Sequence, residues 1–197
     1  MKLKKIYNFR VVLLAVTFII LVVIFNVKNS IRTDYLNYDD YTFLNLQEGI
    51  SLEQKFNSTQ NYLQSISLFF VNIFPDMGNL ILEISNLKGE IIFKNIVDAS
   101  QLVPGEFNKF DIKKYLRNDE DYILRVKYTG QGEADYIGIL AVPAEKNLKI
   151  NGDCIYGGKQ TDVNMVALYE TKTISWTGVT IIIAAMVIIV VFIYNRR

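Results

Sequence analysis

The chain has 197 residues, of which 51% are hydrophobic and 21% are charged, and its net charge is +1. It contains one cysteine and no histidine, which excludes an intrachain disulfide, zinc chemistry and His-dependent acid–base catalysis. All 20 acidic residues lie between residues 28 and 172, whereas the two ends of the chain carry only basic charge. The sequence lacks the basic footprint of a nucleic-acid-binding protein, so we expect no nucleic-acid partner.

The first apolar run covers residues 11–27 and follows a basic segment at 1–10. At 1.5 Å per helical residue it reaches about 26 Å, and the flanking basic residues Arg10 and Lys28 can extend that span. A cleaved signal peptide is the alternative, but the text FNVKNSIR offers no small-residue cleavage site. The pattern therefore predicts an uncleaved transmembrane helix at 11–27 after a cytoplasmic tail at 1–10.

The segment 28–49 is polar and rich in tyrosine, without clear periodicity, and is predicted to be a linker. Its adjacent acids Asp39 and Asp40 have no further ligand nearby in the sequence, so we interpret them as solvated. We expect neither a metal nor another cofactor.

Residues 50–171 show the alternation of short strands. The runs at 79–86 and 90–96 flank a short turn that contains Gly89 and predict a β-hairpin, and the runs at 121–129 and 134–142 predict a second one. About eight such strands indicate an antiparallel β-sandwich of jelly-roll type. Cys154 is interpreted as a buried small hydrophobe, with an intermolecular disulfide as the alternative.

The second apolar run, Ile174 to Tyr194, contains 21 uncharged residues and predicts a transmembrane helix at 174–194 before a cytoplasmic tail at 195–197. Trp176 and Tyr194 stand where the membrane interfaces would lie. The fold class expected is thus an all-β ectodomain flanked by two transmembrane helices. The expected location is the plasma membrane, with two passes through the bilayer, both termini cytoplasmic and the sandwich outside.

Several segments between residues 50 and 170 resemble the extracytoplasmic β-sandwich modules of bacterial envelope proteins, chiefly from Gram-positive bacteria. They are LEQKF, YLQSISLFFVNI, NLILEISNLKGEII, LVPGEFNKFDI, NDEDYILRVKYTG and NGDCIYGGKQTDVNMVALYE. Such modules look like jelly-roll carbohydrate-binding domains and occur in or beside multi-spanning glycosyltransferases and polysaccharide-assembly proteins. The resemblance implies an envelope glycan and a membrane-embedded glycosyltransferase or flippase as partners.

The acids are scattered over turns and strand faces at no spacing that indicates catalysis, so we expect the chain not to be an enzyme. Sugars are bound by aromatic faces and a few polar side chains, and each candidate for such a contact also fits an ordinary strand position. The candidates are Arg125, Lys127, Tyr136, Tyr156, Lys159 and Gln160.

The function expected is that of a non-catalytic, membrane-anchored accessory of envelope polysaccharide or glycolipid assembly, with a sandwich that binds carbohydrate or a protein partner. A polysaccharide chain-length regulator is one alternative, although prolines occur only at 75, 104 and 143 and none precedes the second apolar run closely. A general envelope scaffold or sensor without glycan binding is the other alternative.

Overall fold

The computed structural model describes residues 17–24, 26–33, 40–71, 78–130, 136–144 and 151–195. The predicted tail at 1–10, the end of the tail at 195–197, and Asp39 lie outside these ranges. The chain divides into two compact units. We call Ser30–Thr171 the sandwich unit, and Met1–Asn29 with Lys172–Arg197 the terminal unit.

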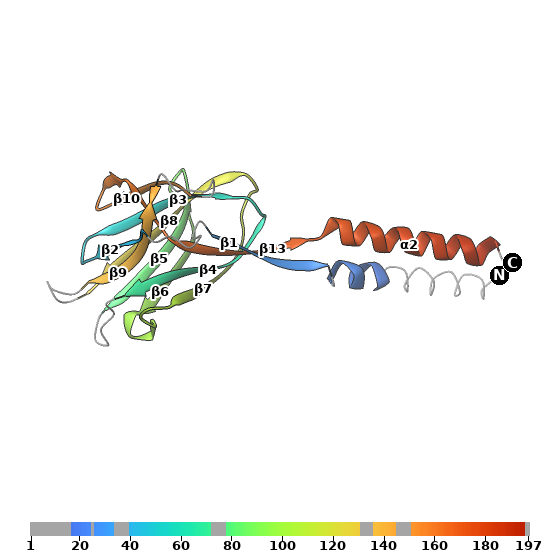
Figure 1. Ribbon diagram of the computed structural model, residues 1–197, viewed down its shortest axis with the longest axis horizontal. Coiled ribbons are helices and arrows are strands. Elements are labelled where there is room, and N and C mark those ends of the chain that lie inside the picture. The colour runs from blue at the N-terminus through green and yellow to red at the C-terminus, as the bar shows by residue number, and fades with distance from the viewer. Residues whose placement is uncertain are drawn as a thin grey trace. The chain divides into compact units, whose positions relative to one another are not determined.

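The sandwich unit is built from two β-sheets (Figure 1). The seven-stranded sheet has the order β1 (Val27–Thr33), β13 (Ala167–Ile174), β4 (Tyr62–Val71), β9 (Ile137–Pro143) and β12 (Val163–Met165), with β2 (Thr42–Leu46) on β9 and β7 (Phe107–Tyr115) on β4. The six-stranded sheet has the order β11 (Lys159–Thr161), β10 (Asn151–Tyr156), β3 (Ser51–Ser58), β8 (Glu120–Thr129), β5 (Asn79–Asn86) and β6 (Ile91–Asp98).

The chain passes from one sheet to the other at most of its connections: from β2 to β3, β3 to β4, β4 to β5, β6 to β7, β7 to β8, β8 to β9, β9 to β10 and β11 to β12. This alternation is typical of jelly-roll-like sandwiches, in which consecutive strands lie in opposite sheets. The predicted β-sandwich is confirmed.

The core lies between the sheets because alternate residues of each strand point inward. In β3, Leu52 and Phe56 are buried while their neighbours are half-buried, and β4 contributes Ile66 and Leu68 from the other sheet. Phe56 stacks on Tyr169 of β13 with ring centroids 5.0 Å apart, which joins the two layers. Fully burying one such side chain stabilises a fold by about 1.5–3 kcal/mol.

Gln54 is a fully buried polar residue that links the two sheets. Its Nε2 donates to the carbonyl oxygen of Gly152 in β10 at 2.8 Å, and its Oε1 accepts from the backbone N–H of Met165 in β12 at 3.0 Å. Both ends of the amide are therefore hydrogen-bonded, as a buried amide requires.

The two predicted hairpins have different outcomes. β5 and β6 pair antiparallel from Asn79↔Asp98 to Ser85↔Ile91, which confirms the first hairpin. The second prediction is wrong, because β8 lies in the six-stranded sheet and β9 lies in the seven-stranded sheet. The alternation in each strand was recognised correctly, but alternation does not specify the partner strand.

Two further features bear on the sequence predictions. Residues 28–49, assigned to a linker, carry β1 and β2 of the seven-stranded sheet. Cys154 in β10 is buried and unbridged, and burial raises the pKa of its thiol. The burial of Cys154 and the raised pKa of its thiol both agree with its interpretation as a small hydrophobe.

In the terminal unit, residues 17–24 are helical and α2 covers Trp176–Asn195. Among the residues that the structure describes, no helix combines the length and apolar character needed to cross a membrane. The predicted transmembrane helices at 11–27 and 174–194 are therefore wrong, and so is the two-pass plasma-membrane location. One end of each apolar run is part of a strand instead of a helix, because β1 begins at Val27 and β13 ends at Ile174.

The membrane-interface role predicted for Trp176 and Tyr194 depended on those helices. Trp176 is the first residue of α2 and is exposed, while the side chain of Tyr194 lies outside the described part of the chain.

Candidate ligand-binding site

Arg125 and Lys127 lie on β8 and point away from the core. The Nε of Arg125 donates to Glu53 Oε1 at 2.8 Å, and its Nη1 lies 3.5 Å from Glu83 Oε2. Hydrogen bonding to Glu53 raises the pKa of Arg125. The guanidinium of Arg125 thus lies between the carboxylates of Glu53 on β3 and Glu83 on β5, the strands on either side of β8. It already binds groups of the protein itself.

Tyr156, Lys159 and Gln160 lie on the β10–β11 hairpin. The hydroxyl of Tyr156 donates to the carbonyl oxygen of Asn45 at 2.5 Å, and burial raises its pKa. Gln160 Nε2 donates to Asp153 Oδ1 at 3.2 Å. Tyr156 therefore anchors the hairpin to the opposite sheet, whereas Lys159 and Gln160 stay on the surface.

Only some of the predicted contact residues share a surface. The strand register places Gln160, Ile155, Glu53 and Arg125 in one row across the six-stranded sheet. Tyr136 precedes β9 of the other sheet and is half-buried. The six predicted residues therefore do not converge on one pocket.

An open hollow of about 560 Å³ lies at one end of the sandwich. We call it the end hollow. One wall is formed by the β5–β6 turn and the start of β6, with Asn86, Leu87, Lys88, Glu90 and Ile92. The other wall is formed by the end of β7 and the start of β8, with Tyr115, Leu116, Arg117, Glu120, Asp121 and Tyr122.

The β5–β6 wall is fixed by hydrogen bonds around Asn86. Asn86 Oδ1 accepts from the backbone N–H groups of Lys88 and Glu90, both at 3.0 Å, and its Nδ2 donates to Glu90 Oε2 at 2.6 Å. Gly89 adopts a φ of 84°, a conformation that glycine accepts without strain. The turn therefore holds its exposed side chains, including Lys88 and Leu87, on a rigid backbone.

The β7–β8 wall is fixed in a similar way. The backbone N–H of Leu116 donates to Asn61 at 3.0 Å, and that of Arg117 donates to the hydroxyl of Tyr122 at 2.9 Å. Asp119 has a φ of 60°, and its N–H donates to Ser58 at 2.6 Å. A ligand entering the end hollow would meet two preformed walls, which lowers the entropic cost of binding.

Tyr115 is the most exposed aromatic residue of the hollow, with 80% of its surface accessible. Its ring meets Tyr62 of β4 edge-to-face, with centroids 4.9 Å apart. Because an edge-to-face contact covers only part of a ring, Tyr115 keeps apolar surface for a ligand.

Both signs of charge line the end hollow. Arg117 Nη1 lies 3.3 Å from Glu120 Oε1, and Lys55 Nζ lies 2.8 Å from Asp121 Oδ2. The hydrogen bond from Lys55 holds the pKa of Asp121 below its usual value of 3.8, with a further contribution from Asn57. Asp121 is therefore an ionised acceptor at neutral pH.

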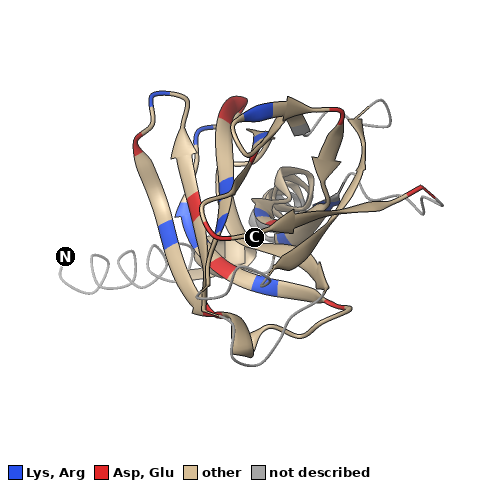
Figure 2. Ribbon diagram, turned by 90° about the vertical axis from the view of Figure 1, so that its left-hand side faces the viewer, with Lys and Arg blue, Asp and Glu red and all other residues tan. Residues whose placement is uncertain are grey.

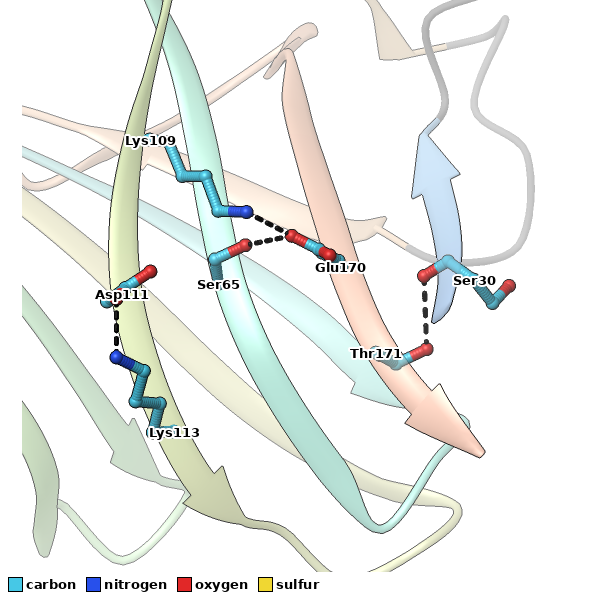
Figure 3. Close-up of polar contacts among 7 residues, drawn as sticks. All are labelled: Ser30, Ser65, Lys109, Asp111, Lys113, Glu170 and Thr171. Carbon is cyan, nitrogen blue, oxygen red and sulfur yellow. Dashed lines mark hydrogen bonds and ion pairs between the residues drawn. The ribbon is translucent and has the colours of Figure 1, made fainter. Parts of the chain in front are cut away.

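A second polar cluster lies on the outward face of the seven-stranded sheet (Figure 3). Glu170 of β13 accepts from Ser65 Oγ at 2.8 Å and from Lys109 Nζ at 2.5 Å, which ties β7, β4 and β13 together. Thr171 donates to the carbonyl oxygen of Ser30 at 3.3 Å and so joins β13 to β1. These contacts serve strand pairing.

The structure thus identifies the end hollow, which sequence reasoning missed. The turn at 86–89 was recognised as a turn, but nothing in the sequence indicated that it faces the segment 115–122, of which residues 115–120 showed no clear pattern. In the described ranges, no group of three or more acidic or cysteine residues gathers as a metal site.

No protein-family model and no curated protein matches the sequence. Among solved structures, the chain is similar to "Crystal structure of infectious bursal disease virus VP2 subviral particle", with 10% identity, a TM-score of 0.31 and coverage of 74% of this chain and 41% of that chain. It is also similar to "Structure of infectious bursal disease virus Gx strain", with 12% identity, a TM-score of 0.30 and coverage of 75% and 40%.

The chain therefore spans about two fifths of the length of these viral chains.

Proposed function

We propose that the sandwich unit is a non-catalytic glycan-binding module and that the end hollow is its binding site. The observation that carries the proposal is the exposed ring of Tyr115 beside fixed polar groups in a hollow of about 560 Å³. Ligand sites for small molecules have volumes of roughly 300–1,000 Å³ and combine apolar walls with a few convergent polar groups.

The polar groups suit sugar hydroxyls. Glu90 and Glu120 supply carboxylate acceptors on opposite walls, and Lys88 and Arg117 supply donors. The ring of Tyr115 offers an apolar surface on which the C–H face of a pyranose can pack. A neutral sugar, which presents hydroxyls all round its ring, can use donors and acceptors together.

Asp121 of the end hollow has a pKa lowered by hydrogen bonds from Lys55 and Asn57, which suits a hydrogen-bond acceptor more than a general acid. Glycosidases need a carboxylic acid with a raised pKa to protonate the leaving group. In the described part of the chain, several carboxyl groups have a displaced pKa, and each is displaced downward by a hydrogen bond: Glu83, Asp98, Asp111 and Asp121.

The class of glycan follows from the sequence resemblance. Residues 50–170 resemble modules that accompany the assembly of bacterial envelope polysaccharide, so these polysaccharides are the ligands to test first. Binding by the sandwich unit requires no membrane anchor. The six contact residues predicted from sequence lie outside the end hollow and stay a separate prediction.

The test is a screen of the purified full-length chain against envelope polysaccharides and their oligosaccharides, followed by calorimetry. Tyr115→Ala should weaken binding at least tenfold, because an aromatic contact contributes about 1.5 kcal/mol. The matched control is Tyr41→Ala, since Tyr41 is 58% exposed and also meets a neighbouring ring, Phe43, edge-to-face.

Tyr41 lies outside the end hollow, so its removal should leave the affinity unchanged. Binding that Tyr115→Ala leaves intact would refute the site. No binding to any envelope glycan would refute the function.

A further inference from the structure

The outward face of the six-stranded sheet carries a row of alternating charges. Glu53 of β3 lies opposite Arg125 of β8, Arg125 opposite Glu83 of β5, and Glu83 opposite Lys94 of β6. The ion pairs follow this register, with distances of 2.8, 3.5 and 2.9 Å. We call these four residues the charge row. Figure 2 shows acidic and basic bands side by side on neighbouring strands.

Aliphatic side chains flank the charge row on both sides. One neighbouring row contains Ile81 and Ile96, and the other contains Ile123 and Ile91, with Ser85 between them. Ile91 and Ile96 are 55% and 57% exposed. Ion-paired charges flanked by exposed isoleucines are more typical of a protein interface than of a solvated sheet face.

We propose that this face is the interface of a symmetric dimer, in which a second copy of the chain packs its own six-stranded sheet against it. The order of charges along the charge row indicates this partner. From β3 to β6 the signs run negative, positive, negative, positive.

A two-fold axis that lies in the interface, parallel to the strands and between β8 and β5, reverses this order in the second copy. Glu53 then faces Lys94 of the other copy, and Arg125 faces the other copy's Glu83. Every charge then faces a charge of the opposite sign, and each contact occurs twice, as it does in any isologous interface. A partner of different sequence would need a matching row by coincidence.

The flanking rows agree with the same axis. Ile96 faces Ser51 of the second copy, and Ile81 faces the aliphatic stem of the second copy's Lys127, because Ser51, Lys127, Ile81 and Ile96 follow one another across the sheet. Lysine stems readily cover apolar surface in this way.

The two-fold axis between β8 and β5 overlaps four strands of each copy, β3, β8, β5 and β6. Strands spaced about 4.8 Å apart and rising about 3.4 Å per residue give these four strands a flat area of about 550 Å². Stable interfaces bury about 800 Å² on each partner, so this dimer belongs to the small, weak class of interfaces. Two sheets pack face to face at about 10 Å, a distance that these long charged side chains bridge.

The experiment reverses one charge at each end of the row in the full-length chain. Glu53→Lys places lysine against lysine across the interface, and Lys94→Glu places glutamate against glutamate. Each variant alone should dimerise at least tenfold more weakly than the unmodified chain, because like charges that face each other repel. Mixing the two should restore dimers, since Lys at 53 then faces Glu at 94.

The matched control is Lys113→Glu. Lys113 is exposed and pairs with Asp111 at 2.6 Å, but it lies on β7 of the other sheet. This variant should dimerise like the unmodified chain. Differently tagged variants and native mass spectrometry distinguish the mixed dimer from each homodimer, so association through another surface does not mimic the result.

Ile96→Asp is a second variant that breaks no ion pair, and it should also weaken the dimer at least tenfold. The proposal is overturned if mixing Glu53→Lys with Lys94→Glu gives no more mixed dimer than chance pairing. It is equally overturned if the unmodified chain stays monomeric at about 100 µM.

Discussion

The two sheets present opposite kinds of outward face. The six-stranded sheet exposes isoleucines but partly buries its charges, so that Glu83 is only 6% exposed between Arg125 and Lys94. The seven-stranded sheet buries an apolar cluster on its outward side, formed by Leu140, Val142 and Val166 with Phe69 and Phe107 packed against them. The six-stranded sheet thus buries ion-paired side chains on its outward side, whereas the seven-stranded sheet buries this hydrophobic cluster there beside the polar cluster around Glu170.

This difference shows that the alternation of residues along a strand defines two faces but does not determine whether either face is exposed to solvent. In β9, Ile137 and Ile139 join the main core, while Leu140 and Val142 join the outward cluster, so the whole strand is apolar. In β8 the outward positions hold Asp121, Arg125 and Lys127 instead. Each sheet therefore responds differently to the same substitution.

Aspartate substitution on each face gives the largest expected contrast. Val142 is 2% exposed, so Val142→Asp buries a charge in an apolar cluster and should lower the free energy of unfolding by about 3 kcal/mol or more. Ile96→Asp on the six-stranded sheet should lower it by less than about 0.5 kcal/mol. Urea unfolding of dilute protein measures both, and equal losses would contradict the contrast.

Removing a cation from each face gives a smaller difference. Arg125→Ala leaves Glu53 and Glu83 without their shared partner and should cost about 2 kcal/mol. Lys109 is more exposed and serves one carboxylate, Glu170, so Lys109→Ala should cost about 1 kcal/mol or less. Thermal unfolding of both variants measures these losses of stability. A larger loss for Lys109→Ala than for Arg125→Ala would contradict the prediction.

The smallest effect concerns pH. The hydrogen bond from Lys94 holds the pKa of Glu83 below its ordinary value of 4.5. A lowered pKa in the folded state stabilises the fold above pH 4.5, and this contribution is lost as the pH falls through the folded-state pKa.

Glu83→Gln should therefore flatten the loss of stability as the pH falls below about 4.5, measured by urea unfolding at each pH. The matched control, Glu106→Gln, changes an exposed carboxylate and should keep the steeper profile. Parallel profiles for the two variants would remove Glu83 as the cause.

The sequence predicted the sandwich because alternation is a local property that each strand carries. It also predicted the β5–β6 hairpin, since the turn around Asn86 and Gly89 determines that pairing by itself. Pairing between distant strands could not be derived, and the supposed β8–β9 hairpin is the consequence. Segment 28–49 was mistaken for a linker because β1, with the sequence VKNSIRT, is mostly polar, and β2, with the sequence TFLNL, has only five residues and shows no clear alternation.

The end hollow was beyond prediction for a similar reason. Its walls come from turns about 30 residues apart, and neither wall has an unusual sequence. The exposure of Tyr115 depends on how β7 ends against β8, which no local pattern records. Arg125 was correctly chosen as an outward residue, but its neighbours Glu53 and Glu83 are brought to it by two different strands.

The amide of Gln54 also constrains the order in which the chain can fold. The backbone N–H that donates to its Oε1 belongs to Met165, which is 111 residues further along the sequence. During synthesis this hydrogen bond cannot form until nearly the whole domain has left the ribosome, so the oxygen of the Gln54 amide lacks this donor until then. Such long-range closure makes folding slow, and premature termination before residue 165 would leave an open, aggregation-prone intermediate.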